Sequence, residues 1–216
     1  MNVVEVPRIS ATPEEFAENF ACKDEPVVLT NLSWGPCKDI WSPEYLCSKL
    51  GSRPVKIHRS KHSNLSFVQK NFSYETLGFD NFVKLCAGQN QVKEYFYLRA
   101  LGNDARGRDV ADFRMHFPAI SEDFVVPEGI YPEGRLFSSV LRVSSGDVQL
   151  WTHYDVMDNI LVQVVGEKRV YLFPPTDAEF IYPVGDKSLV EDLDLPDFDK
   201  FPKLASATCY KCFLKP

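Results

Sequence analysis

The chain has 216 residues, a formal net charge of −6 at pH 7, 44% hydrophobic residues and 16 phenylalanines. This length and apolar content support one domain with a substantial core and exclude an intrinsically disordered chain. The negative charge excludes a protein that coats nucleic acid by bulk electrostatics, although a local basic patch remains compatible with it.

The first half of the chain alternates short helices and strands. Thr12 begins a helix with a capping box that Glu15 completes, and Pro13 suits the first helical position. A second helix begins at Ser42 and stops at Gly51. The other expected elements are strands over 25–30, 55–59 and 94–98 and a helix over 80–88.

The second half changes to β character after a charged segment over 104–116 that is expected to form a loop and a helix. Strands are expected over 136–143, 148–155, 159–165 and 168–173. The shift near residue 93 predicts a mainly β protein with helices (α+β). Residues 1–92 would form an N-terminal α/β cap, and residues 93–216 a barrel in the same domain.

Targeting signals and cysteines point to an intracellular protein. The N-terminus has no basic region followed by an apolar run, and no apolar stretch is long enough to span a bilayer. The six cysteines are spread as in a protein with free thiols, so a cytoplasmic or nuclear location is expected. The pair Cys209 and Cys212 is interpreted as two ordinary thiols, and the acidic stretch 191–199 as a solvated loop.

The stretch from Trp151 to Pro175 carries the candidate chemistry. On a β-strand, His153 and Asp155 point to the same face. An imidazole and a carboxylate side by side are two of the three ligands of a non-haem Fe(II) facial triad. A buried histidine hydrogen-bonded to a carboxylate is the simpler alternative.

Lys168 follows a predicted hairpin. Gly166 and Glu167, between Val165 and Lys168, fit a type II′ turn. In that register Lys168 points into an apolar barrel, where a buried ammonium needs an anion such as a cofactor carboxylate. A solvent-facing lysine beside a turn is the alternative.

Taken together, His153, Asp155, Asn159, Lys168 and the Leu-Phe-Pro-Pro ending at 175 resemble the JmjC family of Fe(II)- and 2-oxoglutarate-dependent oxygenases. The likeness extends to segments 94–102, 109–114 and 137–140 and covers about residues 20–208. It implies a double-stranded β-helix, that is, a jelly-roll, cupin-like barrel.

The resemblance also implies roles for individual residues. His153 and Asp155 would bind Fe(II) and act in catalysis. Lys168 and Tyr97 would contact the distal carboxylate of 2-oxoglutarate, and Asn159 would hydrogen-bond near its chelating end. Iron and its cosubstrate supply the oxidising chemistry in this family.

The wider likeness is to the branch of the family that hydroxylates a hypermodified guanosine, of the wybutosine pathway, beside the anticodon of phenylalanine tRNA. It implies tRNA as partner. Such a partner needs local cations. The densest basic run is Arg53, Lys56, His58, Arg59, Lys61 and His62, with Arg99, Arg106, Arg108, Arg114 and Arg142 as further candidates.

The chain departs from the family pattern at the third iron ligand, because His153 is its last histidine. The barrel is therefore expected to be incomplete at its C-terminal end, in a truncated product with little activity. The alternatives are a pseudoenzyme, a JmjC hydroxylase of asparagine, histidine or lysine side chains, and a non-catalytic domain that binds RNA or a partner or forms a homodimer.

Overall fold

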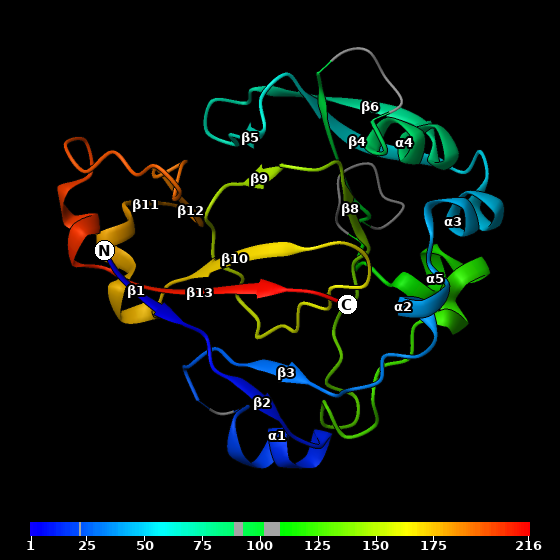
Figure 1. Ribbon diagram of the computed structural model, residues 1–216, viewed down its shortest axis with the longest axis horizontal. Coiled ribbons are helices and arrows are strands. Elements are labelled where there is room, and N and C mark those ends of the chain that lie inside the picture. The colour runs from blue at the N-terminus through cyan, green and yellow to red at the C-terminus, as the bar shows by residue number, and fades with distance from the viewer. Residues whose placement is uncertain (22, 89–92, 102–108) are drawn as a thin grey trace. The chain divides into compact units, whose positions relative to one another are not determined.

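A computed structural model describes residues 1–21, 23–88, 93–101 and 109–216 (Figure 1). The chain divides into two compact units that interleave along the sequence. The first unit comprises Met1–Ser33, Pro127–Tyr131 and Trp151–Pro216, and the second comprises Trp34–Val126 and Pro132–Leu150. The cap and barrel boundary expected at residue 92 stays a prediction.

The first unit is built on a three-stranded sheet in the order β1-β13-β10 (Figure 1). The central strand, β13, pairs in parallel with β1 and antiparallel with β10. Val6, Val28 and Cys212 form a small buried core beside this sheet. The elements of the unit are β1 (Asn2–Glu5), β2 (Arg8–Ser10), α1 (Pro13–Asn19), β3 (Val28–Thr30), β10 (Lys168–Leu172), the 3-10 helix η2 (Pro175–Ile181), β11 (Pro183–Val184), β12 (Lys187–Ser188), η3 (Pro202–Ser206) and β13 (Thr208–Leu214).

The second unit is built on a four-stranded antiparallel sheet in the order β6-β4-β7-β8. Helix α4 packs against β6 and β7. Ile57 and Leu98, which pair across β4 and β7, are almost completely buried. The elements of the unit are α2 (Cys37–Ile40), α3 (Pro43–Leu50), β4 (Pro54–Ser60), β5 (Asn64–Leu65), β6 (Phe72–Gly78), α4 (Phe79–Cys86), β7 (Tyr95–Arg99), α5 (Phe113–His116), η1 (Pro118–Asp123), β8 (Arg142–Ser144) and β9 (Gln149–Leu150).

The helix ends follow the sequence signals. The Thr12 side chain accepts from the backbone N–H of Glu15, whose carboxylate accepts from the backbone N–H of Thr12, so the predicted capping box is confirmed. Ser42 caps α3 in the same way through the N–H of Tyr45. Gly51 ends that helix with a φ of 51°, a left-handed value that glycine adopts without strain.

The strands expected in the second half are only partly present. Residues 168–172 form β10, but the strand expected over 136–143 is reduced to Arg142–Ser144, and that over 148–155 to Gln149–Leu150. None of residues 159–165 lies in a strand, so the hairpin predicted around Gly166 is wrong. A strand needs a partner for its backbone N–H and C=O groups, and β10 pairs with β13 instead.

A half-buried carboxylate joins distant segments of the second unit. Asp123 accepts hydrogen bonds from the indole N–H of Trp41 and the hydroxyl of Tyr45, each at 2.9 Å. Trp41 is buried, so its N–H has little access to water. The three side chains therefore tie η1 to the helical segment that begins the unit.

Replacing Asp123 with Ala removes the acceptor of the buried Trp41 N–H, and we expect the free energy of unfolding to fall by about 2 kcal/mol. Urea denaturation measures this change. Glu122→Ala, at the exposed neighbouring position, is the matched control and should change stability by less than about 0.5 kcal/mol. Equal stabilities of the two variants would contradict the role assigned to Asp123.

Candidate functional site

The segment that carries the candidate metal ligands is held by a small hairpin that the sequence analysis missed. His153 forms an antiparallel bridge with Lys187 of β12. The N–H of Tyr154 donates to the carbonyl of Asp186 at 3.1 Å, and the N–H of Ser188 donates to that of Thr152 at 2.9 Å. Strands β11 and β12 pair through a turn at Gly185, which has a φ of 61°. Gly-Asp between Val184 and Lys187 is a hairpin signal that could have revealed it.

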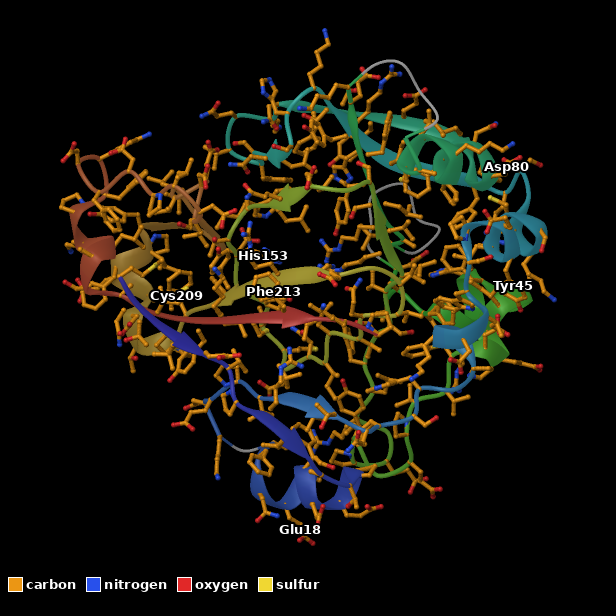
Figure 2. All side chains as sticks on the ribbon, viewed as in Figure 1. Glu18, Tyr45, Asp80, His153, Cys209 and Phe213 are labelled. Carbon is orange, nitrogen blue, oxygen red and sulfur yellow. The ribbon has the colours of Figure 1, made fainter. Side chains whose placement is uncertain are left out.

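His153 presents one ring nitrogen for coordination. Its Nδ1 lies 2.9 Å from the carbonyl oxygen of Trp151. A carbonyl only accepts, so Nδ1 carries the proton and Nε2 of the neutral ring keeps its lone pair. The side chain is exposed on the segment that leads toward β10 (Figure 2). A ring fixed through one nitrogen is the usual state of a metal-binding histidine.

Asp155 and Asn159 interact with each other. The amide of Asn159 donates to Oδ2 of Asp155 at 3.1 Å, and both side chains are exposed. A hydrogen bond of this kind orients a carboxylate while leaving its other oxygen free to bind a cation. Imidazole and carboxylate are donors suited to Fe(II), so the chemistry of His153 and Asp155 fits the predicted metal.

The part of the chain that the structure describes assembles no third ligand around this pair. Among the residues that the structure describes, no group of three or more His, Cys, Asp or Glu side chains could hold a metal ion. His58 and His116 are engaged in the second unit, where Nδ1 of His58 lies 3.3 Å from the carbonyl of Tyr97 and Nδ1 of His116 accepts from the N–H of Asp112 at 3.4 Å.

Lys168 lies at the start of β10, opposite Leu214 of β13, and is half-buried. Because side chains alternate along a strand, Lys168 points to the same face as Val170. Val170 packs on the buried cluster of Val6, Val28 and Cys212. The lysine therefore shares the apolar face of its sheet. Pairing of β10 with β13 sets this orientation, and not the predicted hairpin.

Tyr97 belongs to the second unit, on β7, and is only 4% exposed. Burial raises the pKa of its hydroxyl, and the nearby Arg142 and Arg99 partly offset this rise. The phenol is therefore protonated at neutral pH and able to donate to an anion. A hydrogen bond with Arg142 places a cation beside it.

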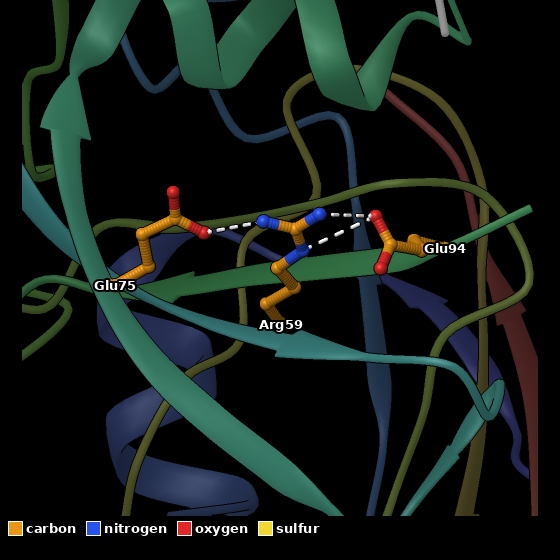
Figure 3. Close-up of polar contacts among 3 residues, drawn as sticks. All are labelled: Arg59, Glu75 and Glu94. Carbon is orange, nitrogen blue, oxygen red and sulfur yellow. Dashed lines mark hydrogen bonds and ion pairs between the residues drawn. The ribbon is translucent and has the colours of Figure 1, made fainter. Parts of the chain in front are cut away.

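The basic run over 53–62 is not one patch. Arg59 forms ion pairs with Glu75 at 3.0 Å and Glu94 at 2.7 Å (Figure 3). The guanidinium of Arg53 lies over the ring of Phe117, 5.3 Å from its centroid. Lys56 and His58 point to the opposite face of β4 from Arg59. Arg106 and Arg108 lie outside the described residues.

The interpretation of Cys209 and Cys212 as ordinary thiols agrees with the structure, whereas the acidic stretch 191–199 is more than a solvated loop. Cys209 and Cys212 are buried free thiols, and burial raises the pKa of Cys209 to about 11 and also raises that of Cys212. Their spacing on β13 sends them to opposite faces, so they remain two separate thiols. In the acidic stretch, Asp194 is not a solvated side chain, because it accepts from Arg169 and Tyr171 of β10.

Comparisons with known proteins agree on one family. A model of the cupin-like domain matches residues 13–216, in agreement with the predicted jelly-roll, cupin-like fold class. A tRNA wybutosine-synthesizing protein 5 from Gallus gallus is 46% identical over 98% of this chain and 68% of its own length. Its Homo sapiens counterpart is 44% identical over 97% and 68%. The chain thus spans about two thirds of these relatives.

A tRNA wybutosine-synthesizing protein 4 from Aspergillus oryzae is 37% identical over 83% of this chain and 17% of that protein. Within the residues described by the structure, no helix is both long enough and apolar enough to cross a bilayer.

Gly185 allows the turn that holds the His153 segment, so Gly185→Ala should destabilise the first unit. An alanine held in the left-handed backbone conformation costs about 1–2 kcal/mol. The added Cβ would meet open space, so this cost comes from the backbone conformation and not from a clash. Gly146→Ala, also in open space but without a positive φ, is the control. Urea unfolding of both variants tests this expectation, and equal midpoints would contradict it.

Proposed function

The chain belongs to the cupin-like family and to the group of proteins named tRNA wybutosine-synthesizing protein 5, and from this we propose that it serves as a JmjC-type hydroxylase of the wybutosine pathway. Its substrate would be the modified guanosine beside the anticodon of phenylalanine tRNA. The observation that carries this proposal is the 44–46% identity to these relatives over nearly the whole of this chain, together with the His153 and Asp155 donor pair.

We assign Fe(II) to His153 and Asp155. Nδ1 of His153 faces the Trp151 carbonyl, which leaves Nε2 as the ring nitrogen that can reach a metal, and the amide of Asn159 orients Asp155. When bound, iron with 2-oxoglutarate and oxygen supplies the oxidising power needed to hydroxylate an unactivated carbon. The protein residues bind and orient the metal, and Asn159 keeps the carboxylate from rotating.

The 2-oxoglutarate carboxylate is assigned to Tyr97 and Lys168. The buried Tyr97 hydroxyl stays protonated and donates, and Lys168 supplies a positive charge from the apolar face of its sheet. A charged donor in an apolar setting binds a carboxylate more strongly than it would in water.

A second candidate function is a tRNA-binding module without turnover. The observation that favours it is that the described residues assemble no group of three metal ligands around His153 and Asp155. Both candidates share the tRNA substrate, so tRNA binding does not separate them. Iron binding does.

Deleting the gene in its source organism should leave phenylalanine tRNA with the unhydroxylated form of the wybutosine nucleoside. Mass spectrometry of nucleosides from purified tRNA measures the loss of one oxygen. Re-expression of the wild-type gene should restore the mass, and re-expression with His153→Ala should not. An unchanged hydroxylated nucleoside after deletion would refute the proposed reaction.

The purified 216-residue chain should bind Fe(II) weakly and turn over little 2-oxoglutarate, because two protein ligands hold the metal less firmly than three. Titration with Co(II) as an optical probe measures binding, and succinate release measures turnover. His153→Ala should abolish the residual binding. Stoichiometric metal binding with sustained turnover would contradict this expectation and the module without turnover.

A further inference from the structure

The second unit presents an aromatic surface on one side of its four-stranded sheet. In the register of the sheet, His58 of β4 lies opposite Tyr74 of β6 and Tyr97 of β7, and Ser60 lies opposite Phe72 and Tyr95. Directly paired residues project to the same side. We call this side, made by His58, Phe72, Tyr74, Tyr95 and Tyr97, the aromatic face.

Four rings of the aromatic face, those of His58, Phe72, Tyr74 and Tyr97, form one continuous layer. The His58 ring lies 4.8 Å from both Phe72 and Tyr74 and 5.3 Å from Tyr97, measured between centroids. Phe72 and Tyr74 meet edge to face at 5.7 Å. Burial lowers the pKa of His58, so the centre of this layer is neutral at pH 7.

The layer is open to solvent at its β6 end. Tyr74 is 55% exposed on an edge strand, and Phe67, 6.3 Å from Phe72, is 36% exposed. By contrast, Ile57 and Leu98, at the alternate positions of β4 and β7, are buried. The aromatic face is therefore buried at Tyr97 and accessible at its β6 end, where the rings of Tyr74 and Phe67 are available for contact.

The loop that carries Phe67 is firmly attached to the sheet. Asn71 accepts from the N–H of Ser66 and donates to the carbonyl of Asn64, each at 2.8 Å. Ser60 of β4 donates to the carbonyl of Asn71 at 2.9 Å. The Phe67 ring is thus presented at a defined place beside Phe72, which lowers the entropy lost when it binds a ligand.

Charge selects the kind of ligand. The paired strand residues of this side include Lys56, Arg99 and Arg142 and no acidic residue. The ammonium of Lys56 lies 4.8 Å from the centroid of the Tyr74 ring. Exposed rings beside cations, with no carboxylate among them, match single-stranded nucleic acid, whose bases stack and whose phosphates pair with the cations.

We propose that the aromatic face binds unpaired nucleotides of an RNA loop, with a base stacked on Tyr74 and a neighbouring phosphate at Lys56. This inference rests on the proposed function, because it places part of the RNA substrate. The aromatic face lies wholly within the second unit. We expect RNA contact there and not at Arg59, because the charge of Arg59 is already paired with Glu75 and Glu94.

The test is the affinity of the 216-residue chain for a fluorescent anticodon stem-loop of phenylalanine tRNA, followed by anisotropy. Tyr74→Ala and Tyr74→Leu should each weaken binding about tenfold, because a stacking ring is lost. Tyr74→Phe keeps the ring and should bind within about twofold of wild type. Leucine preserves apolar bulk at this exposed site, and Phe198→Ala, at another exposed aromatic residue, is the matched control.

A second readout reports stacking itself. A 2-aminopurine base in the loop should lose fluorescence on binding wild type and Tyr74→Phe, and keep it with Tyr74→Leu. If RNA binds wild type and Tyr74→Leu equally, the aromatic face is refuted while the proposed tRNA substrate stands. If wild type binds no RNA, both the aromatic face and the proposed substrate are refuted.

Discussion

Strand pairing, which sends successive side chains to opposite faces of a sheet, is the constraint on which the functional surfaces of this protein depend. In the first unit, β13 pairs with β10 and so turns Lys168 toward the apolar face that Val170 shares. In the second unit, pairing of β4 with β6 and β7 sends His58 to the aromatic face and Arg59 to the other. A one-residue shift in either register would exchange these faces.

Where strand pairing is sparse, the candidate site residues His153, Asp155 and Asn159 are exposed. Between β9 and β10 the chain is attached mainly by the bridge of His153 to Lys187 and by local bonds such as that between Asn159 and Asp155. Water around exposed ligands weakens their attraction for a divalent cation relative to a dry pocket. In the proposed iron site, affinity would therefore depend on how far the segment from Trp151 to Lys168 is shielded from water, as well as on the identity of the ligands.

The two proposed roles draw on different parts of the chain. The metal donors and Lys168 belong to the first unit, whereas Tyr97 and the aromatic face belong to the second. Tyr97 takes part in both proposals, because its ring contacts His58 in the aromatic face and burial keeps its hydroxyl protonated.

Local signals and short motifs could be read from the sequence alone. The Thr12 capping box, the helix that stops at Gly51 and the strand around Ile57 depend on neighbouring residues, so their outcome was predictable. The order of His153, Asp155 and Lys168 likewise pointed to the family.

The tertiary structure alone decided which strands formed partners. Residues 159–165 have strand-like alternation but no ladder, and the short hairpin at Gly185 holds His153 instead. Pairing between distant segments depends on backbone hydrogen bonds that no local pattern encodes.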